Sequence, residues 1–253
     1  VSIRVNPNVD PKTHPYISTG LKGSKFGIAH ERTLGTYQRA SGLAGLQVVG
    51  IDCHIGSQIT QEEPYLDAVD RMLDLVEVIE GAGITIHHID FGGGLGINYN
   101  GDQPPQADQL WTRLLSRLDA RGFGQRQLMI EPGRSLVGNA GVCLTEVLYL
   151  KPGEQKNFCI VDAAMNDLPR PAMYQAYHQI VPVTPRSVTP TTWEVVGPVC
   201  ESGDWIGHDR ELGVQPGDVL AVLSAGAYCM SMASNYNSRG RAAEILVDGA
   251  QTH

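Results

Sequence analysis

Strand-like and helix-like segments alternate along the first half of this chain, and that alternation restricts the fold more than any other feature. Two amphipathic segments, 64–83 and 107–122, repeat apolar residues at helical spacing and end at glycines. Shorter β-branched runs stand before, between and after them, at 46–56, 84–94 and 127–135. Such an alternation indicates parallel strands joined by right-handed crossovers.

The segment 107–122 shows the burial that we expect of these helices. Asp108 stands where an N-cap would lie, and Gly122 follows the last apolar residue. The leucines expected to face the core are Leu110, Leu114, Leu115 and Leu118.

The pattern changes after about residue 140. Short strand-like runs, separated by turns such as "KPGE" and "QPGD", replace the alternation, and only 170–179 looks briefly helical. These runs are 145–151, 157–164, 191–199, 218–226 and 243–248. We therefore predict an α/β domain over residues 1–140 and a mostly antiparallel β domain over residues 141–253.

Composition narrows the possible partners. The net charge is −8 with scattered Lys and Arg, so nucleic acid is not an expected partner. No apolar stretch reaches the length of a membrane span, so a membrane is not expected either. The five cysteines are an odd number without paired or metal-ligand spacing, which predicts free thiols, a cytoplasmic location and no metal site.

Three of the predicted strands end in glycine-containing turns. These turns are "HIGSQ" (54–58), "GGGLG" (92–96) and "EPGRS" (131–135). The carboxyl ends of parallel strands meet at one edge, and glycines let backbone N–H groups approach an anion there. A phosphate pocket beside His54 and Glu131 suggests a phosphorylated heteroaromatic cofactor, with the imidazole stacked on the ring and the carboxylate pairing with a pyridine nitrogen.

Taken singly, each of these residues has a structural explanation as well. A glycine triplet more often marks a tight loop, His54 alone is more often structural, and Glu131 alone is more often an ion-pair partner. Cys200 by itself is more often a structural thiol than a catalytic one. The combination at successive strand ends favours a binding site.

Several long motifs, in order, make the chain resemble a known family. They are "RVNPNVDPKTHPYISTGLKGSKFGI" (4–28), "CHIGSQ" (53–58), "DFGGGLGI" (90–97), "EPGRSLVGNAG" (131–141), "VDAAMNDLPRPAMYQAYH" (161–178), "VGPVCESGD" (196–204) and "GAYCMSMASNYNSR" (226–239). With them the chain resembles the diaminopimelate decarboxylases, pyridoxal 5'-phosphate enzymes of the alanine-racemase-like barrel type, over essentially its whole length.

The resemblance implies a set of cofactor-binding residues. His54 would stack on the pyridine ring, and Glu131 would pair with the ring nitrogen. The implied contacts with the cofactor are His54, Ser57, Gly92, Gly93, Gly94, Glu131, Gly133, Arg134 and Tyr236.

It also implies substrate-binding and catalytic residues. His54 and Cys200 are the catalytic candidates, and Cys200 would be the proton donor. The implied contacts with the amino-acid substrate are Arg134, Arg170, Tyr174, Glu201 and Tyr236. Arginine suits this substrate because its planar guanidinium binds carboxylates through two hydrogen bonds. In this family two subunits share each active site, so the resemblance implies a homodimer in which the "CESGD" loop serves the partner.

The implied reaction is decarboxylation of meso-2,6-diaminopimelate to L-lysine and CO2, the last step of lysine biosynthesis. The implied fold is the second half of a (β/α)8 TIM-type barrel followed by a β domain that is incomplete at its end. The family's Schiff-base lysine has a "YAxKAN"-like context, which the lysines here lack: Lys12, Lys22, Lys25, Lys151 and Lys156. We therefore expect an N-terminally and C-terminally truncated chain that is inactive by itself.

Two alternatives stay open at this point. One is a decarboxylase of another basic amino acid, of the ornithine or arginine type. The other is a non-catalytic homologue that acts as a binding protein, although such a protein has no evident use for Cys200, Glu201, Arg134 and Tyr236.

Overall fold

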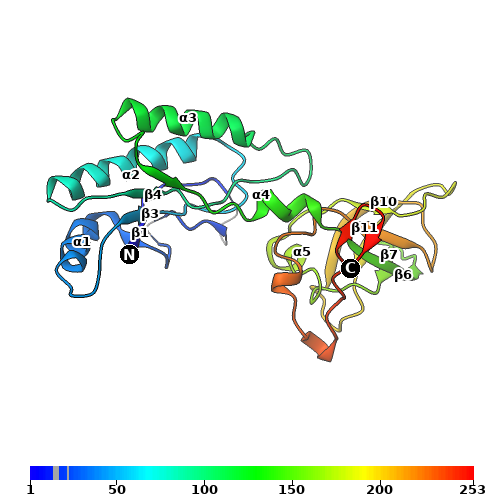
Figure 1. Ribbon diagram of the computed structural model, residues 1–253. Helices are drawn as coiled ribbons and strands as arrows, with labels where there is room; N and C mark the ends of the chain where they lie inside the picture. The colour runs from blue at the N-terminus through cyan, green and yellow to red at the C-terminus, as the bar shows by residue number, and fades with distance from the viewer. Residues whose placement is uncertain (14–16, 22) are drawn as a thin grey trace. The chain divides into compact units, whose positions relative to one another are not determined.

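The computed structural model describes residues 1–13, 17–21 and 23–253 (Figure 1). Four residues of the 4–28 motif, His14, Pro15, Tyr16 and Lys22, lie outside this part. The chain folds into two compact units, Val1–Leu136 and Val137–His253.

The first unit is built on a parallel sheet. Its strand order is β2-β1-β3-β4-β5, and every neighbouring pair runs parallel. The strands are β1 (Ser2–Asn6), β2 (Ile28–Ala29), β3 (Gly50–Asp52), β4 (His88–Asp90) and β5 (Gln127–Met129). Ile51, Ile89 and Leu128 stand side by side across three of them. The predicted parallel strands are therefore confirmed, although each is shorter than its apolar run.

Three helices pack on this sheet, and two of them were predicted. They are α1 (Thr33–Ser41), α2 (Glu63–Gly81) and α3 (Ala107–Ala120). Buried residues of α2 and α3 join Val5, Ile51 and Ile89 of the strands in one apolar core. A short helix, α4 (Arg134–Val137), follows β5, and single 3-10 turns cover His30–Arg32 (η2) and Gly138–Ala140 (η3).

Two expectations for α3 are wrong. Leu115 is 46% exposed, because the helix buries only the narrow stripe of Leu110, Leu114 and Leu118, and Leu115 lies a further 100° round the axis. Asp108 is not the N-cap: the cap position is Gln106, and no side chain caps it.

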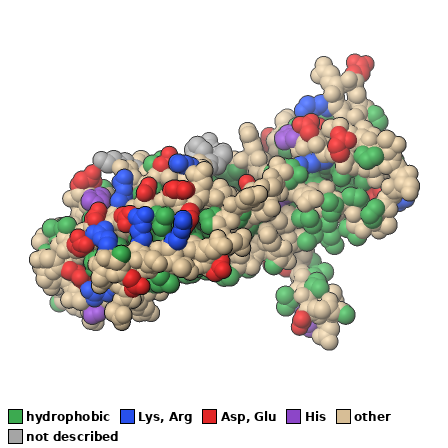
Figure 2. Space-filling view, turned by 90° about the horizontal axis from the view of Figure 1, so that it is seen from above, with side chains coloured by type: hydrophobic (Ala, Val, Ile, Leu, Met, Phe, Trp, Pro, Cys, Tyr) green, Lys and Arg blue, Asp and Glu red, His purple; other side chains and the backbone are tan. Residues whose placement is uncertain are grey.

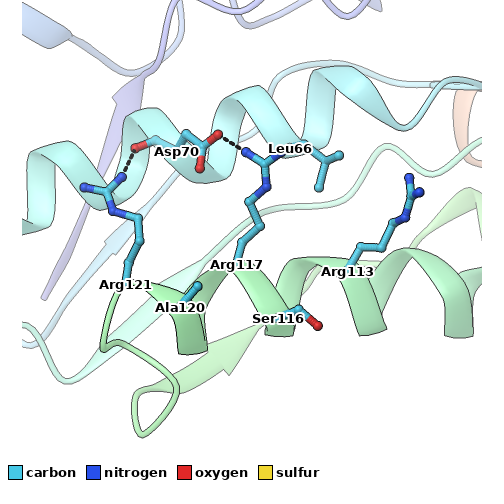
Figure 3. Close-up of a pocket in the computed structure, with 7 residues that line it drawn as sticks. All are labelled: Leu66, Asp70, Arg113, Ser116, Arg117, Ala120 and Arg121. Carbon is cyan, nitrogen blue, oxygen red and sulfur yellow. Dashed lines mark hydrogen bonds and ion pairs between the residues drawn. The ribbon is translucent and has the colours of Figure 1, made fainter.

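Charged side chains join the outer faces of α2 and α3 (Figure 3). Arg117 forms an ion pair with Asp70, and Arg121 donates to the Asp70 carbonyl at 3.1 Å and pairs with Glu77 at 2.6 Å. Seen from above, basic and acidic side chains alternate over this unit (Figure 2). These exposed pairs link the two helices but add little stability, because water screens them.

The second unit is built on a six-stranded, mostly antiparallel sheet, as predicted. Its order is β10-β9-β7-β6-β11-β8, in which only the β7–β9 pair is parallel among the described strands. The strands are β6 (Cys143–Lys151), β7 (Phe158–Val161), β8 (Ile180–Pro182), β9 (Thr191–Val196), β10 (Trp205–Leu212) and β11 (Val219–Val222).

The remaining segments of the second unit depart from the prediction. The helix expected over 170–179 ends early, as α5 (Arg170–Tyr174), because Gln175 is left-handed with φ +53°. The run 243–248 forms only β12 (Val247–Asp248), which pairs with β13 (Gln251–Thr252). Two 3-10 turns, η4 (Met230–Met232) and η5 (Tyr236–Ser238), lie before them. Across the described parts of the chain, no helix combines the length and hydrophobicity needed to cross a membrane.

Candidate functional site

The loops that follow β3, β4 and β5 are joined by their backbones. The Cys53 N–H donates to the carbonyl of Asp90 at 3.0 Å, and the Glu131 N–H donates to the carbonyl of Gly92 at 2.9 Å. The Asp90 carboxylate in turn accepts from the Gly92 N–H at 2.8 Å. The structure thus brings together His54, the glycine triplet and Glu131, which sequence analysis placed at successive strand ends.

The three glycines allow these loops to pack without side chains between them. A Cβ on Gly93 would lie 2.1 Å from the Glu131 carbonyl oxygen, and one on Gly92 would lie 2.3 Å from that of Cys53. Gly94 has φ +99°, and its Cβ would lie 2.1 Å from the Gly56 carbonyl oxygen. Any larger residue at these places would push neighbouring loops apart.

His54 is held as a neutral ring. Its Nδ1 accepts a hydrogen bond from the Gly93 N–H at 3.1 Å, so its proton lies on Nε2. Burial lowers the pKa of His54, and the positive charge of Arg4 lowers it further. A neutral, oriented imidazole is suited to stacking on a heteroaromatic ring.

Arg134 is buried, and it donates hydrogen bonds to two hydroxyl oxygen atoms. It is only 5% exposed, its Nη1 donates to Tyr99 Oη at 2.7 Å and its Nη2 donates to Ser57 Oγ at 2.9 Å. The guanidinium also lies 5.7 Å from the centre of the Tyr99 ring. Sequence analysis named Arg134 and Ser57 but missed Tyr99, because nothing in its spacing marks a contact 35 residues along the chain.

Carboxylates gather beside these loops. Burial raises the pKa of Asp52 to about 6, and the negative charges of Asp90 and Glu131 raise it further against the opposing effect of Arg4. Glu131 itself is exposed at the end of β5, as is Gly133. An exposed carboxylate at this place can hold a proton on a basic ring nitrogen.

In the second unit, α5 carries two of the predicted substrate ligands. Arg170 is only 5% exposed, and its Nη1 lies 2.7 Å from His178 Nε2. Tyr174 is half-buried one helical turn further on. Sequence analysis assigned no role to His178.

Three of the predicted site residues are exposed: Cys200, Glu201 and Tyr236. The exposure of Cys200 is unusual, because most free cysteines in proteins are buried. Tyr236 Oη donates to Glu201 Oε2 at 3.2 Å, and this hydrogen bond raises the pKa of Tyr236. The structure therefore brings Glu201 and Tyr236 together although they are 35 residues apart.

A buried polar cluster supports the segments that carry these residues. Asp204 accepts from the Met165 N–H at 2.6 Å and from the Val199 N–H at 2.8 Å. Asn166 Oδ1 accepts from Arg239 Nε at 2.9 Å. Sequence analysis assigned nothing to Asp204 or Asn166, because a polar residue in a turn looks the same whether or not it binds a distant loop.

Comparison with known proteins identifies the family. Residues 1–138 match the family model described as "Pyridoxal-dependent decarboxylase, pyridoxal binding domain". The chain belongs to the pyridoxal-dependent decarboxylases. Pyridoxal phosphate is accordingly the family's cofactor, as the resemblance implied.

Relatives within this decarboxylase family match the whole chain. It is 57% identical to the diaminopimelate decarboxylase of Pseudomonas aeruginosa, over 100% of this chain and 60% of the relative. It is 49% identical to that of Aquifex aeolicus, over 98% of this chain and 59% of the relative. The chain thus spans about 60% of the length of the curated relatives that it matches.

Solved decarboxylase structures agree in fold. Diaminopimelate decarboxylase from Helicobacter pylori, complexed with L-lysine, gives a TM-score of 0.91 at 40% identity, covering 100% of this chain and 62% of that one. Diaminopimelate decarboxylase from "m. jannaschii", also in complex with L-lysine, gives a TM-score of 0.91 at 41% identity, covering 100% of this chain and 59% of that one.

The residues of the first unit fit pyridoxal phosphate chemically. They combine the neutral imidazole of His54, the exposed carboxylate of Glu131 and the hydroxyl of Ser57. The loop of Gly92, Gly93 and Gly94 adds closely packed backbone with no side chains between its segments. The N–H groups of Gly92 and Gly93 already donate to Asp90 and His54, so these two glycines shape the loop more than they supply anion donors.

Proposed function

We propose that the intact protein carrying this chain catalyses the decarboxylation of meso-2,6-diaminopimelate to L-lysine and CO2, with pyridoxal phosphate as cofactor. The observation that carries this proposal is the 57% identity, over all 253 residues, to the diaminopimelate decarboxylase of Pseudomonas aeruginosa. The two relatives solved with L-lysine bound support an amino-acid ligand of the same class.

The first unit supplies the cofactor-binding residues in this proposal. Bound pyridoxal phosphate supplies an acceptor for the electron pair that remains when CO2 leaves. His54 stacks on the ring, and Glu131 keeps the ring nitrogen protonated. Phosphate and ring contacts are assigned to Ser57, Gly92, Gly93, Gly94, Gly133, Arg134 and Tyr236. Gly92 and Gly93 contribute through the close approach of their backbone, because their N–H groups already donate to Asp90 and His54.

Arg134 and Arg170 bind the carboxylates of the substrate. Diaminopimelate has two carboxylates and two amino groups, and a guanidinium binds a carboxylate through paired hydrogen bonds. Both guanidinium groups are buried, so desolvation strengthens their attraction for a carboxylate. Glu201 binds the distal amino group, and Tyr174 and Tyr236 make further substrate contacts.

Cys200 delivers the proton that replaces CO2 on the substrate carbon. Its exposure on the loop before Asp204 leaves the thiol open to a substrate.

We propose a homodimer in which this loop serves the partner's site. Mixing Arg134→Ala and Cys200→Ala subunits should then restore about a quarter of the active sites, since each mixed dimer rebuilds one of two. A mixture as inactive as its components contradicts a shared site.

The fold proposed for the first unit is the second half of a (β/α)8 barrel. Its parallel strands, and the helices that follow β2, β3, β4 and β5 along the chain, support this architecture. The residue boundaries 1–140 and 141–253 stay predictions. The cytoplasmic location stays a prediction too, as does the inactivity of the 253-residue chain, since none of its lysines has the context of the family's cofactor lysine.

The test is a substrate profile of the protein expressed from its complete reading frame. CO2 release is measured with diaminopimelate, ornithine and arginine, and bound cofactor is measured by its absorbance. Fastest turnover of diaminopimelate is expected, and Arg113→Ala, on the outer face of α3, is the matched control with unchanged rates. Faster turnover of ornithine or arginine contradicts the substrate assignment. A protein that is purified without cofactor and binds none favours the alternative of a non-catalytic binding protein.

A further inference from the structure

One buried histidine is not accounted for by the proposed mechanism. His178 is 0% exposed, which is unusual for a titratable side chain. Its Nε2 lies 2.7 Å from Arg170 Nη1, and its Nδ1 lies 2.9 Å from the carbonyl oxygen of Leu223. Both ring nitrogens are therefore within hydrogen-bond distance of a fixed partner.

These partners determine the protonation of the ring. A guanidinium can only donate, so Nε2 must carry the lone pair that receives the Arg170 N–H. A carbonyl can only accept, so the proton lies on Nδ1 and points at Leu223. His178 is therefore a neutral imidazole of a single tautomer, and protonating Nε2 would place two donors against each other.

Backbone hydrogen bonds hold the segments on both sides of this contact. Gln175, with φ +53°, ends α5, and the Ala176 N–H turns back to the Arg170 carbonyl at 3.4 Å. Directly after His178, the Leu223 N–H donates to the Gln179 carbonyl at 2.8 Å, beside the paired strands β8 and β11. The imidazole is thus anchored on the sheet, and Arg170 lies on the short helix that the imidazole braces.

From this geometry we infer that His178 is a positioning residue, whose neutral Nε2 orients the Arg170 guanidinium for a substrate carboxylate. This inference rests on the proposed function, which makes Arg170 a substrate ligand. A neutral acceptor such as the His178 imidazole suits that role. A carboxylate in place of the imidazole would also orient Arg170, but its negative charge would compete with the carboxylate of the substrate. A neutral nitrogen fixes the direction of the guanidinium without placing a negative charge beside it.

Two amide substitutions separate the two hydrogen bonds. In His178→Gln the amide oxygen can reach the position of Nε2 and still accept from Arg170. In His178→Asn the shorter amide can reach only the position of Nδ1, so the bond to Leu223 is kept and the acceptor for Arg170 is lost. Both variants remove the ring, and they therefore serve as controls for each other.

The experiment measures steady-state kinetics of the intact holoenzyme with diaminopimelate and the binding of one competitive ligand, 1,5-diaminopentane. We expect His178→Asn to raise KM for diaminopimelate by about tenfold to a hundredfold, with kcat changed far less, because a hydrogen bond to a charged group is lost. His178→Gln should recover most of that KM. Affinity for 1,5-diaminopentane, which has no carboxylate, should be equal in both variants and in the unsubstituted protein.

The outcomes distinguish the inference from the function on which it rests. If the unsubstituted protein neither binds nor decarboxylates diaminopimelate, the proposed function fails, and the inference fails with it. If it does both, but the Asn and Gln variants have the same KM, His178 is only a packing residue. Equal weakening of diaminopimelate and 1,5-diaminopentane also overturns the inference, because a general loss of structure does not discriminate between ligands with and without carboxylates.

Discussion

The carboxylate of Asp204 accepts a hydrogen bond from the backbone N–H of Met165 at 2.6 Å, joining two loops that are 39 residues apart. The same carboxylate accepts from the Val199 N–H, next to Cys200. One buried side chain therefore sets the spacing between the loop that leads to Arg170 and the loop that carries the proposed proton donor.

Replacing Asp204 by Asn should weaken this connection. The amide retains one acceptor oxygen, but its NH2 group then faces a backbone N–H, and an unsatisfied buried donor costs about 1–3 kcal/mol. We expect the melting temperature of the intact protein to fall by about 5 °C in a thermal scan. Asp209→Asn, at an exposed left-handed position that Asn tolerates, is the matched control. Equal melting temperatures for the two variants would contradict the role given to Asp204.

Gly93→Ala should separate the loops that follow β4 and β5. The new Cβ would lie 2.1 Å from the Glu131 carbonyl oxygen, and backbone must move to relieve that contact. We expect affinity for pyridoxal phosphate, followed by absorbance titration, to fall by at least about tenfold, since displaced ligands lose their alignment.

Gly81→Ala is the control for that substitution, because a Cβ there meets nothing within 4 Å. It lies at the end of α2 and should be neutral or slightly stabilising, by up to about 1 kcal/mol. Unchanged cofactor affinity in Gly93→Ala would mean that the loops tolerate the displacement.

Tyr99→Phe should remove one hydrogen bond that orients the Arg134 guanidinium while leaving the aromatic ring beside it. The phenyl ring remains beside the guanidinium, but the oxygen that accepts from Nη1 at 2.7 Å is gone. We expect KM for diaminopimelate to rise about tenfold, consistent with the loss of one hydrogen bond to a charged group. Tyr149→Phe removes a hydroxyl from a residue that is 68% exposed and should leave KM unchanged.

Asp52 should make stability depend on pH. Its pKa is raised from 3.8 to about 6 in the folded protein, chiefly by burial, so between pH 4 and 6 the folded state binds more protons than the unfolded state. The contribution of this group to stability therefore decreases as the pH rises through that window. Asp52→Asn removes the effect and should be more stable than the unsubstituted protein at pH 7, by on the order of 1 kcal/mol after allowance for solvent screening.

Thermal unfolding at several pH values checks this prediction. The two melting curves should coincide near pH 4, where Asp52 is protonated in the folded state, and separate progressively toward pH 7. A constant difference across the range would show that Asp52 does not titrate in this window.

Local patterns were sufficient to predict much of the fold. The apolar spacing in α2 and α3 is carried by their own sequences, and glycines mark the loops after the strands. Helix α1 was missed because its buried positions are Thr33, Tyr37 and Ala40, and these include too few strongly apolar residues to mark a helical face in the sequence. Strand β10 was missed because its register shifts around Gly207 interrupt the alternation of buried and exposed residues.

The candidate site could be predicted only in part, for a related reason. His54, the glycine triplet and Glu131 stand at strand ends, where sequence order alone brings them to one edge. The partners of the two arginines, Tyr99 and His178, are selected by tertiary folding and have no local signature.

The backbone contact between Gly93 and Glu131 also restricts how this family can change. Because these loops touch through main-chain atoms, an insertion or bulky residue in one must be matched by a change in its neighbour. Engineering a different substrate specificity into this fold should therefore require that the loops after β3, β4 and β5 are exchanged together. Exchanging any one alone should yield misfolded protein before it yields a new substrate preference.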